Sequence, residues 1–473
     1  MKNNKRMRNL LIGPIIFLLL AFFIPDSVFS YSSRVCLGMV AWMGHWWITL
    51  PVGIGVTALI PLAVNALFNF VPMGAIVPQY MNATVLLVFG ASVLSITLNE
   101  SGLDRRIALK FLSMFGTSAV SQITAWLLIS AAISSVLPNI AAVALMLPIA
   151  GAMLEQSGIK NVSESKLGMM VLTVVAWGAS LGGMGTPLGG SMNLVGTDWF
   201  EKVTGNEFSY GNWVLHVLPI MIPFIIVFLL IRIAGIPKGL KLEGSKDFYK
   251  EEFAKLGKMR RDEWISMSLF LAPTILSFAR PLYQAYLPAA ANAFMFIIFA
   301  LISFCINKSD GTPLITWPSM QSKMSWSMIW VLGCGLAVGS CMIESGVTVR
   351  LAEMLQVFNF DGGFTTIFAF TLLAILLAEF CNNVTAAAVI LPIIVSVCDQ
   401  IGVSPIPYMY FIIPAYNTAF MMPTSIRAMP LAYGVTPASI IKNGAVQTLA
   451  SLIVIPVMGY LLLTLFPGWY SIA

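Results

Sequence analysis

Long apolar stretches recur along the whole chain and are separated by short polar segments. Their hydrophobic residues lack the strict alternation of barrel strands, so the pattern predicts helices. Stretches of this length and apolarity can cross a lipid bilayer. The pattern therefore predicts an all-α polytopic membrane protein. The clearest stretches are Leu10–Ile24, Ile54–Val71, Val171–Leu188, Val214–Ile231, Ala290–Ile306, Thr365–Phe380 and Ala445–Phe466.

Composition supports this class. Hydrophobic residues make up 58% of the 473 residues and charged residues only 10%, whereas about a quarter of the residues in a soluble protein are charged. The first apolar stretch follows several basic residues, as in a secretory signal peptide, but no small-residue cleavage site comes directly after it. Because many further stretches follow, we interpret it as a retained first helix.

The distribution of basic residues predicts an orientation. We expect about eleven spans with a cytoplasmic N-terminus and an external C-terminus. With this assignment the inside loops hold 21 of the 26 Lys and Arg residues and the outside loops hold four. The remaining one, Arg427, lies within an apolar region. The net charge of +6 is spread over membrane loops, so it predicts no nucleic-acid partner.

Residues that usually hold metals or perform enzyme chemistry are sparse. The six cysteines form no CxxC pair, and the two histidines are far apart in the sequence. We therefore expect no metal site, no cofactor and no enzymatic activity.

A repeat with a constant offset runs through the chain. Landmark residues recur 244 positions later without a gap: Asn139 and Asn383, Pro148 and Pro392, Glu100 and Glu344, and Arg106 and Arg350. We predict two repeats, 35–235 and 264–473, after an N-terminal cytoplasmic segment and first helix at 1–34. An odd number of spans per repeat, about five, inverts the second copy in the membrane, as in secondary transporters. A channel is a less suitable interpretation, because two inverted halves with broken helices fit alternating access better than a pore.

The longest charged stretch, 236–263, lies between the repeats. Its mixed charges predict a solvated cytoplasmic connector. A regulatory element or a lipid contact is the alternative, which nothing in the sequence favours.

Two similar apolar stretches contain asparagines. They read "LPNIAAVALMLPIA" (Leu137–Ala150) and "CNNVTAAAVILPII" (Cys381–Ile394), and with their prolines they are too short to be clean spans. We predict the tips of two re-entrant hairpins, because non-helical backbone at membrane depth must be buried in protein or line a watery cavity. Free N–H groups and an amide can bind a carboxylate there. The alternative is that each asparagine caps a helix or ties two helices together.

An ordered set of motifs over nearly the whole chain resembles the divalent anion:sodium symporter (DASS) family, the transporters of di- and tricarboxylates. Besides the two asparagine stretches, the motifs are "WWITLPVGIGVTALIPL" (Trp46–Leu62), "GLDRRIALKFL" (Gly102–Leu112), "GGMGTPLGGSMNLVG" (Gly182–Gly196) and "AFMMPTSIRAMPLAYG" (Ala419–Gly434). Arsenite and sodium/proton exchangers share the general architecture but match these stretches less well.

The resemblance implies a homodimer in which a transport domain moves like an elevator against a scaffold domain. It also implies that the hairpin tips and the unwound parts of the fifth and tenth helices hold the substrate. The corresponding residues are Asn139, Gly189, Gly190, Ser191, Asn382, Asn383, Thr424 and Ser425.

The chain departs from the family at positions tied to sodium. The family has a Ser-Asn-Thr triplet at each tip, whereas this chain has Pro138 and Ile140 around the first asparagine and Val384 after the second. Sodium prefers oxygen ligands, although backbone carbonyls can supply some. Where the family reads Thr-Pro-Pro-Asn, this chain has Arg427 in the sequence Ile-Arg-Ala-Met. These departures argue against sodium as a coupling ion.

We interpret Arg427 as a fixed positive charge in place of a bound cation, able to clamp a carboxylate through two hydrogen bonds. Alternatively, it extends to lipid headgroups or pairs with a structural acid. Glu379, just before the second tip, could pair with Arg427, bind a coupling proton or support a helix end.

The sequence thus predicts a plasma-membrane antiporter that exchanges C4 and C5 dicarboxylates of the malate, succinate, fumarate and 2-oxoglutarate class without sodium. A transport domain with an uncompensated charge should cross the low-dielectric barrier poorly unless an anion neutralises it, which favours exchange. Sodium-coupled symport of di- and tricarboxylates, citrate included, is the alternative. The expected partners are these anions, membrane lipid and a second copy of the chain.

Overall fold

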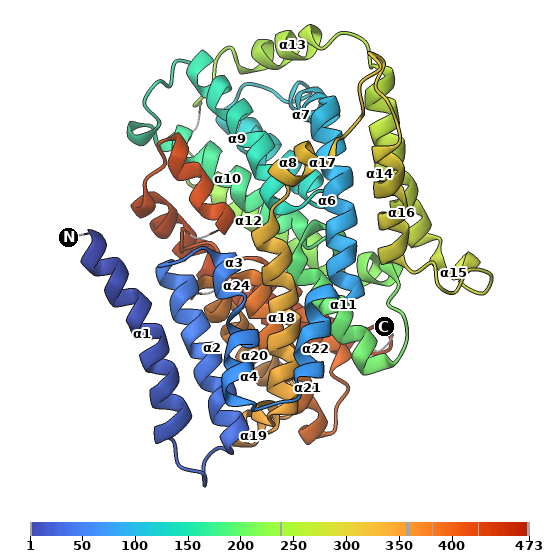
Figure 1. Ribbon diagram of the computed structural model, residues 1–473. Helices are drawn as coiled ribbons and strands as arrows, with labels where there is room; N and C mark the ends of the chain where they lie inside the picture. Colours follow the sequence, from blue (N-terminus) through green and yellow to red (C-terminus); the bar gives the residue numbers. More distant parts are fainter. Residues whose placement is uncertain (1, 237–238, 356–359, 381, 424, 471–473) are drawn as a thin grey trace.

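The computed structural model describes residues 2–236, 239–355, 360–380, 382–423 and 425–470. Within these ranges the chain is helical, and β structure is limited to two isolated bridges (Figure 1). The first half contains α1 (Lys2–Phe23), α2 (Tyr31–Thr49), α3 (Ile54–Thr57), α4 (Ile60–Phe68), α5 (Met73–Ile76), η1 (Val77–Met81), α6 (Ala83–Ser101), α7 (Leu103–Leu112), α8 (Ala119–Ser134), α9 (Asn139–Gln156), η2 (Val162–Glu164), α10 (Lys166–Gly183), η3 (Pro187–Gly189), α11 (Ser191–Thr204) and α12 (Tyr210–Ala234). The second half contains α13 (Ser245–Lys255), α14 (Arg261–Phe278), α15 (Arg280–Tyr283), α16 (Asn292–Phe304), α17 (Trp317–Lys323), α18 (Trp326–Glu344), α19 (Val347–Leu355), α20 (Phe364–Phe380), α21 (Asn383–Ile401), α22 (Ile406–Phe411), α23 (Ile413–Asn417), η5 (Ser425–Tyr433) and α24 (Pro437–Leu465).

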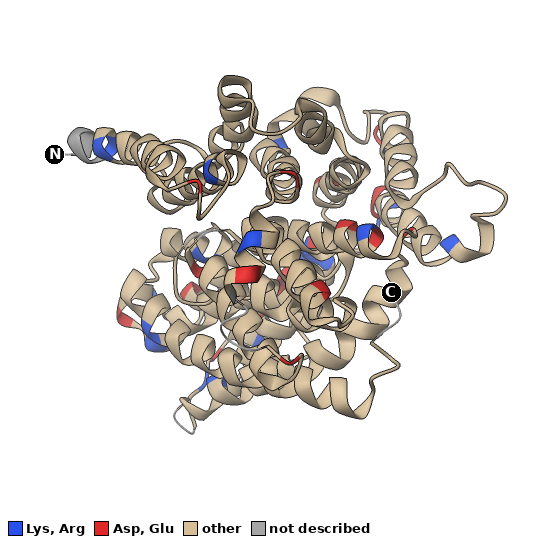
Figure 2. Ribbon diagram, turned by 90° about the horizontal axis from the view of Figure 1, so that it is seen from below, with Lys and Arg blue, Asp and Glu red and all other residues tan. Residues whose placement is uncertain are grey.

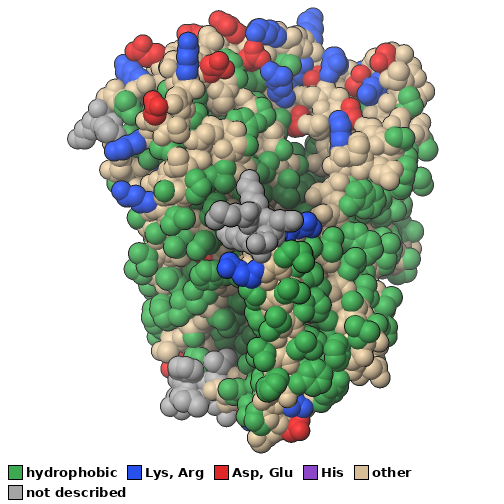
Figure 3. Space-filling model, turned by 60° about the vertical axis from the view of Figure 1, so that its left-hand side comes forward, with side chains coloured by type: hydrophobic (Ala, Val, Ile, Leu, Met, Phe, Trp, Pro, Cys, Tyr) green, Lys and Arg blue, Asp and Glu red, His purple; other side chains and the backbone are tan. Residues whose placement is uncertain are grey.

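The helices are those of a multi-pass membrane protein. In the part of the chain described, eight helices are long and apolar enough to cross a membrane, and four shorter ones are also apolar. Large hydrophobic side chains lie exposed on α1, α12 and α24, where lipid can cover them. Figure 3 shows hydrophobic side chains over the middle of one face, with charged side chains gathered at its upper end. Charged positions are also sparse among the helices seen from below in Figure 2. The predicted all-α polytopic class is confirmed.

The two halves repeat one order of elements. In each half a long helix (α6, α18) precedes a shorter one (α7, α19), a helical hairpin (α8–α9, α20–α21), a broken helix (α10–α11, α22–α23–η5) and a final long helix (α12, α24). Gly102 and Gly346 follow the first helix of each half with φ values of 77° and 73°, a left-handed conformation that favours glycine. They are 244 positions apart, so the sequence repeat has the same local geometry in both copies.

The first hairpin packs backbone to backbone on α10. A Cβ atom at Gly178 would lie 2.5 Å from the carbonyl oxygen of Leu127, and one at Gly182 would lie 1.9 Å from that of Ala131. Small residues allow helices to approach this closely. The contact places the hairpin tip beside the point where α10 ends, at Gly183.

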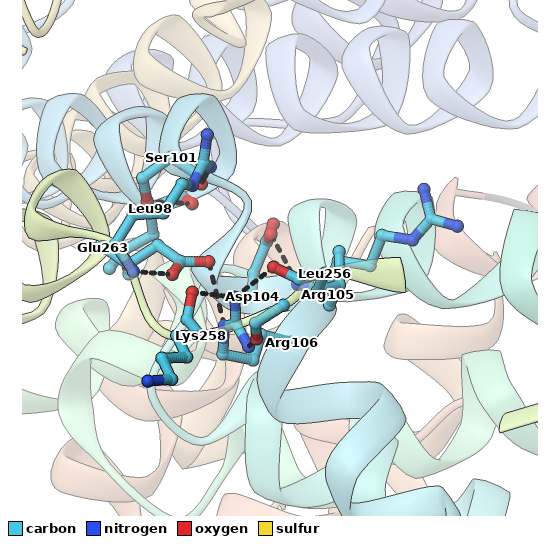
Figure 4. A network of polar contacts seen from close by, with 10 residues as sticks. Leu98, Ser101, Asp104, Arg105, Arg106, Leu256, Lys258 and Glu263 are labelled. Carbon is cyan, nitrogen blue, oxygen red and sulfur yellow. Dashed lines mark hydrogen bonds and ion pairs between the residues drawn. The ribbon is translucent and has the colours of Figure 1, made fainter. Parts of the chain in front are cut away.

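The charged connector is partly docked on the helices, so the expectation of a solvated segment describes only some of it. Arg106 of α7 forms a buried ion pair with Glu263 of α14 at 3.0 Å. The same guanidinium donates to the carbonyls of Leu256, Gly257 and Lys258 in the connector. Figure 4 shows how these groups converge on Arg106.

The connector also binds the first hairpin. Tyr249 of α13 is fully buried, and its hydroxyl donates to Gln122 Oε1 of α8 at 2.6 Å. Glu252 forms an ion pair with Arg105 of α7 at 2.6 Å, and the neighbouring Lys255 ammonium lowers the pKa of this carboxyl. The connector therefore links α7 and α14 to the hairpin that reaches the site.

We expect Gly182→Ala to destabilise the protein, because the added methyl group would overlap the Ala131 carbonyl oxygen and force α8 away from α10. Overpacking of this kind costs about 1–3 kcal/mol. The measurement is the thermal unfolding midpoint of the purified protein in detergent. Gly74→Ala is the control, because nothing lies within 4 Å of a Cβ atom at that position. Equal midpoints for the two variants would contradict the packing.

Candidate functional site

A cavity of about 720 Å³ lies where the two hairpin tips meet the broken helices. Residues of α2, α6 and α18 also line it, among them Trp47, Ser92 and Met328. The predicted site residues that line the cavity are Asn139, Gly190, Ser191, Asn382, Asn383, Ser425 and Arg427. Gly189 contributes a carbonyl that Asn139 binds, and Thr424 lies outside the described residues.

Three helices begin at this cavity. α9 starts at Asn139, α11 at Ser191 and α21 at Asn383, and all three residues line it. The first N–H groups of a helix lack intrahelical partners, and the helix dipole makes this end positive. The Asn382 side chain caps α21 by accepting from Thr385 N at 2.9 Å, whereas α9 and α11 have no side-chain cap among the described residues. Such helix ends suit an anion.

The tip asparagines hold the tips to the broken helices. In the orientation that satisfies its hydrogen bonding, the Asn139 amide nitrogen donates to the carbonyl oxygens of Gly189 (2.7 Å) and Ala179 (3.2 Å). Asn383 Nδ2 donates to the carbonyl oxygen of Asn417 at 2.7 Å. These contacts match the alternative in which each asparagine ties two elements together. Both residues also line the cavity, so the two interpretations do not exclude each other.

The two broken helices are joined to each other by fully buried amides. Asn417 Nδ2 donates to Asn193 Oδ1 at 2.8 Å. Asn193 Nδ2 donates to the carbonyl oxygens of Gly183 (2.6 Å) and Thr186 (2.8 Å). Neither asparagine was predicted as a site residue. Each lies in an apolar stretch beside a break, which is the signal that identified the tips.

Arg427 lies at the cavity wall with its guanidinium on backbone carbonyls. Its Nε donates to the carbonyl oxygen of Met422 at 2.7 Å, and its Nη1 donates to that of Ala419 at 2.8 Å. Both carbonyls belong to the non-helical segment between α23 and η5. The residue is only 3% exposed, which does not fit an arginine that extends to lipid headgroups.

Glu379 of α20 binds the N–H groups of the same segment. Its carboxylate accepts from the N–H groups of Phe420 (2.7 Å), Met421 (3.0 Å) and Met422 (2.9 Å) and from Thr448 Oγ1 of α24 (2.9 Å). Both oxygens accept hydrogen bonds, which is the bonding pattern of an ionised carboxylate. Of the roles left open for Glu379, these contacts match the support of a helix break.

Two re-entrant hairpins and two broken helices around one cavity define the fold of a secondary transporter. The chain belongs to the family described as the sodium:sulfate symporter transmembrane region, whose profile matches residues 4–469. The resemblance to the DASS family is thereby confirmed.

Two relatives extend over nearly the whole chain. The sodium-dependent dicarboxylate transporter SdcS of Staphylococcus saprophyticus is 26% identical over 478 residues, covering 97% of this chain and 92% of that protein. The protein of the same name from Staphylococcus aureus strain MRSA252 is 24% identical over 471 residues, covering 96% and 90%. Among solved structures, the YdaH transporter of Alcanivorax borkumensis shares the fold with a TM-score of 0.52 and 12% identity, over 93% of this chain and 99% of that one.

We expect Asn193→Ala to destabilise the protein by about 1–3 kcal/mol, because it removes one of the two acceptors of the Asn417 amide and the donor to two backbone carbonyls. The thermal unfolding midpoint in detergent measures this. Asn206→Ala, in an exposed turn, is the matched control and should unfold like the parent protein. An Asn193→Ala protein as stable as this control would show that the buried amide bridge is dispensable.

Proposed function

We propose that this protein is a secondary transporter that exchanges C4 and C5 dicarboxylates across the membrane without sodium. The observation that carries the proposal is the Arg427 guanidinium, held at the cavity wall by the carbonyls of Ala419 and Met422. Carbonyls of an unwound helix are ligands that a hard cation takes in transporters. Here a covalently attached cation takes two of them, and it cannot leave with the substrate.

Several positive or donor groups support an anion with more than one charge. The N-terminal ends of α9 and α11 and the guanidinium of Arg427 face one cavity. Asn382 Nδ2, also at the cavity, is buried without a hydrogen-bond partner among the described residues. Donors from both halves of the chain suit a molecule with a carboxylate at each end. The two relatives named above are dicarboxylate transporters, which supports succinate, malate, fumarate and 2-oxoglutarate as the substrate class.

The charge arrangement supports exchange. Moving positive groups through the apolar barrier is costly when no opposite charge lies beside them. Glu379 offsets the charge of Arg427 from across the unwound segment, but it is not among the residues that line the cavity. Among the charged residues that line the cavity, Asp104 and Lys323 have opposite charges, so Arg427 leaves a net positive charge there that a bound anion can balance. The loaded site should therefore cross more easily than the empty one, so inward and outward movements each carry an anion.

The arrangement of the cavity walls supports an elevator movement. The cavity is lined by hairpin tips and broken helices and also by α2, α6 and α18, as expected when a transport domain slides along a scaffold. We place elements of both repeats, 35–235 and 264–473, in each domain, and we assign the protein as a homodimer. The charged end that carries α13 is assigned to the cytoplasm together with the N-terminus, and the C-terminus to the outside.

Sodium-coupled symport is the second candidate. The two relatives are named as sodium-dependent, and two oxygens next to the second tip, Thr385 Oγ1 and Asn417 Oδ1, are buried without hydrogen-bond partners among the described residues. Such oxygens are potential ligands of a hard cation. This candidate predicts uptake that depends on a sodium gradient.

Transport by the purified protein in proteoliposomes distinguishes the two candidates. We expect uptake of radiolabelled succinate and malate to require unlabelled dicarboxylate inside the vesicles and to ignore external sodium, because the fixed charge of Arg427 replaces a bound cation. Protein-free vesicles are the control. Uptake into dicarboxylate-free vesicles that requires a sodium gradient would overturn exchange and establish symport.

Arg427→Ala should lose succinate binding. Deleting a charge-assisted contact costs about 1.5–3 kcal/mol, equivalent to about a 10- to 100-fold loss of affinity. The readout is the succinate concentration that half-saturates thermal stabilisation in detergent. Arg350→Ala removes an arginine that pairs with exposed Glu353 and should bind succinate normally. Unchanged affinity in Arg427→Ala would refute the role of Arg427 in binding.

A further inference from the structure

Glu379 and Arg427 bind opposite ends of one peptide unit. Glu379 Oε1 accepts from Phe420 N at 2.7 Å, and Arg427 Nη1 donates to the carbonyl oxygen of Ala419 at 2.8 Å. The described chain contains no cis peptide bond, so the C=O of Ala419 and the N–H of Phe420 point in opposite directions. The carboxylate and the guanidinium therefore lie at opposite edges of the peptide plane and polarise it in the same sense. Hydrogen bonds linked in this way strengthen each other.

A second pair of contacts meets at one residue, Met422, through two neighbouring peptide units. Met422 N donates to Glu379 Oε2 at 2.9 Å, while Met422 O accepts from Arg427 Nε at 2.7 Å. Glu379 thus occupies the N–H groups of the segment, and Arg427 occupies its carbonyls. Successive free N–H groups form a site that attracts anions. Because Glu379 already fills it, a substrate carboxylate is directed to the cavity side of the segment.

The first repeat shows that such a break does not require charge. The position 244 residues before Glu379 is Ser135, whose hydroxyl donates to the Ala132 carbonyl one turn earlier. The first break is held by Asn193, which donates to the carbonyls of Gly183 and Thr186. Neutral groups thus satisfy one break and charged groups the other. Buried charges are rarely the most stable solution, which indicates a role beyond stability.

We propose that Glu379 is a positioning residue of the anion site and acts on Arg427 through the peptide unit between Ala419 and Phe420. This inference rests on the proposed function, in which Arg427 binds the substrate. Glu379 fixes the direction of the carbonyls that hold the guanidinium, and Thr448 anchors the carboxylate to α24. The two residues act together: without Glu379, Arg427 is misplaced for an anion, and without Arg427, Glu379 has no cation to position.

A double-mutant cycle tests the coupling. Succinate affinity is measured by thermal stabilisation in detergent for the parent protein, Glu379→Gln, Arg427→Gln and the double variant. We expect each single variant to bind about tenfold more weakly, a typical coupling between linked groups, and the double variant to bind no worse than Arg427→Gln. Glu379→Asp, which restores the charge, should recover part of the affinity. Effects that multiply in the double variant would overturn the proposal.

A second pair of variants covers the case in which Glu379→Gln does not fold. Thr448→Val removes only one hydrogen bond from the carboxylate and should weaken succinate binding about threefold. Thr464→Val, on the same helix, removes a hydroxyl that bonds only carbonyls of its own helix and should bind normally. Equal succinate affinity in these two variants would contradict the positioning role of Glu379.

The outcomes separate this inference from the proposed function. If Arg427→Gln binds succinate like the parent protein, the proposed function fails. If Arg427→Gln binds weakly while Glu379→Gln and Thr448→Val bind normally, only the role of Glu379 fails. A purely structural role for Glu379 would lower the unfolding midpoint without changing the succinate concentration for half-saturation.

Discussion

Backbone groups at membrane depth must find hydrogen-bond partners within the protein, and the site of this transporter depends on that requirement. Each half of the chain breaks a helix beside the cavity and thereby frees N–H and C=O groups. At the first break, the Asn193 amide takes the carbonyls of Gly183 and Thr186. At the second, Glu379 takes three N–H groups and Arg427 takes two carbonyls. The same contacts that satisfy the backbone also place donors around the cavity.

The two halves satisfy the backbone groups freed at their breaks with different side chains, and this difference makes the charge distribution of the site asymmetric. Amides are neutral, so the first break contributes donors without a net charge. The second break contributes a carboxylate and a guanidinium, of which only the guanidinium lines the cavity. The Asn193–Asn417 hydrogen bond joins the breaks, so the neutral and charged halves are held together as one unit. The inverted repeat thus places a helix break from each half at the cavity, and Arg427 of the second copy gives the cavity its net positive charge.

Much of this arrangement follows from the sequence because apolar length and a gapless repeat are local or periodic signals. The constant offset of 244 located both tips, and the glycines at 102 and 346 have the same backbone conformation. Partners across the fold give no such signal. The bonds of Glu379 with residues 420–422 and of Asn193 with Asn417 depend on how separate elements pack, which spacing along the chain does not encode. The docking of α13 was missed for the same reason, since Tyr249 meets Gln122 only after the connector folds back on α8.

The proposed replacement of a sodium ion by Arg427 rests on the same backbone requirement. A transporter that fills the carbonyls of an unwound segment with a bound ion has an incomplete segment whenever the ion leaves. When a side chain fills them, the segment keeps its partners with and without substrate, because Arg427 is covalently part of it. Under the proposed function, independence from sodium and a preformed anion site would then have a single cause. The cost is a positive charge that stays with the site in every state, and an anion is the ligand that can balance it from the cavity.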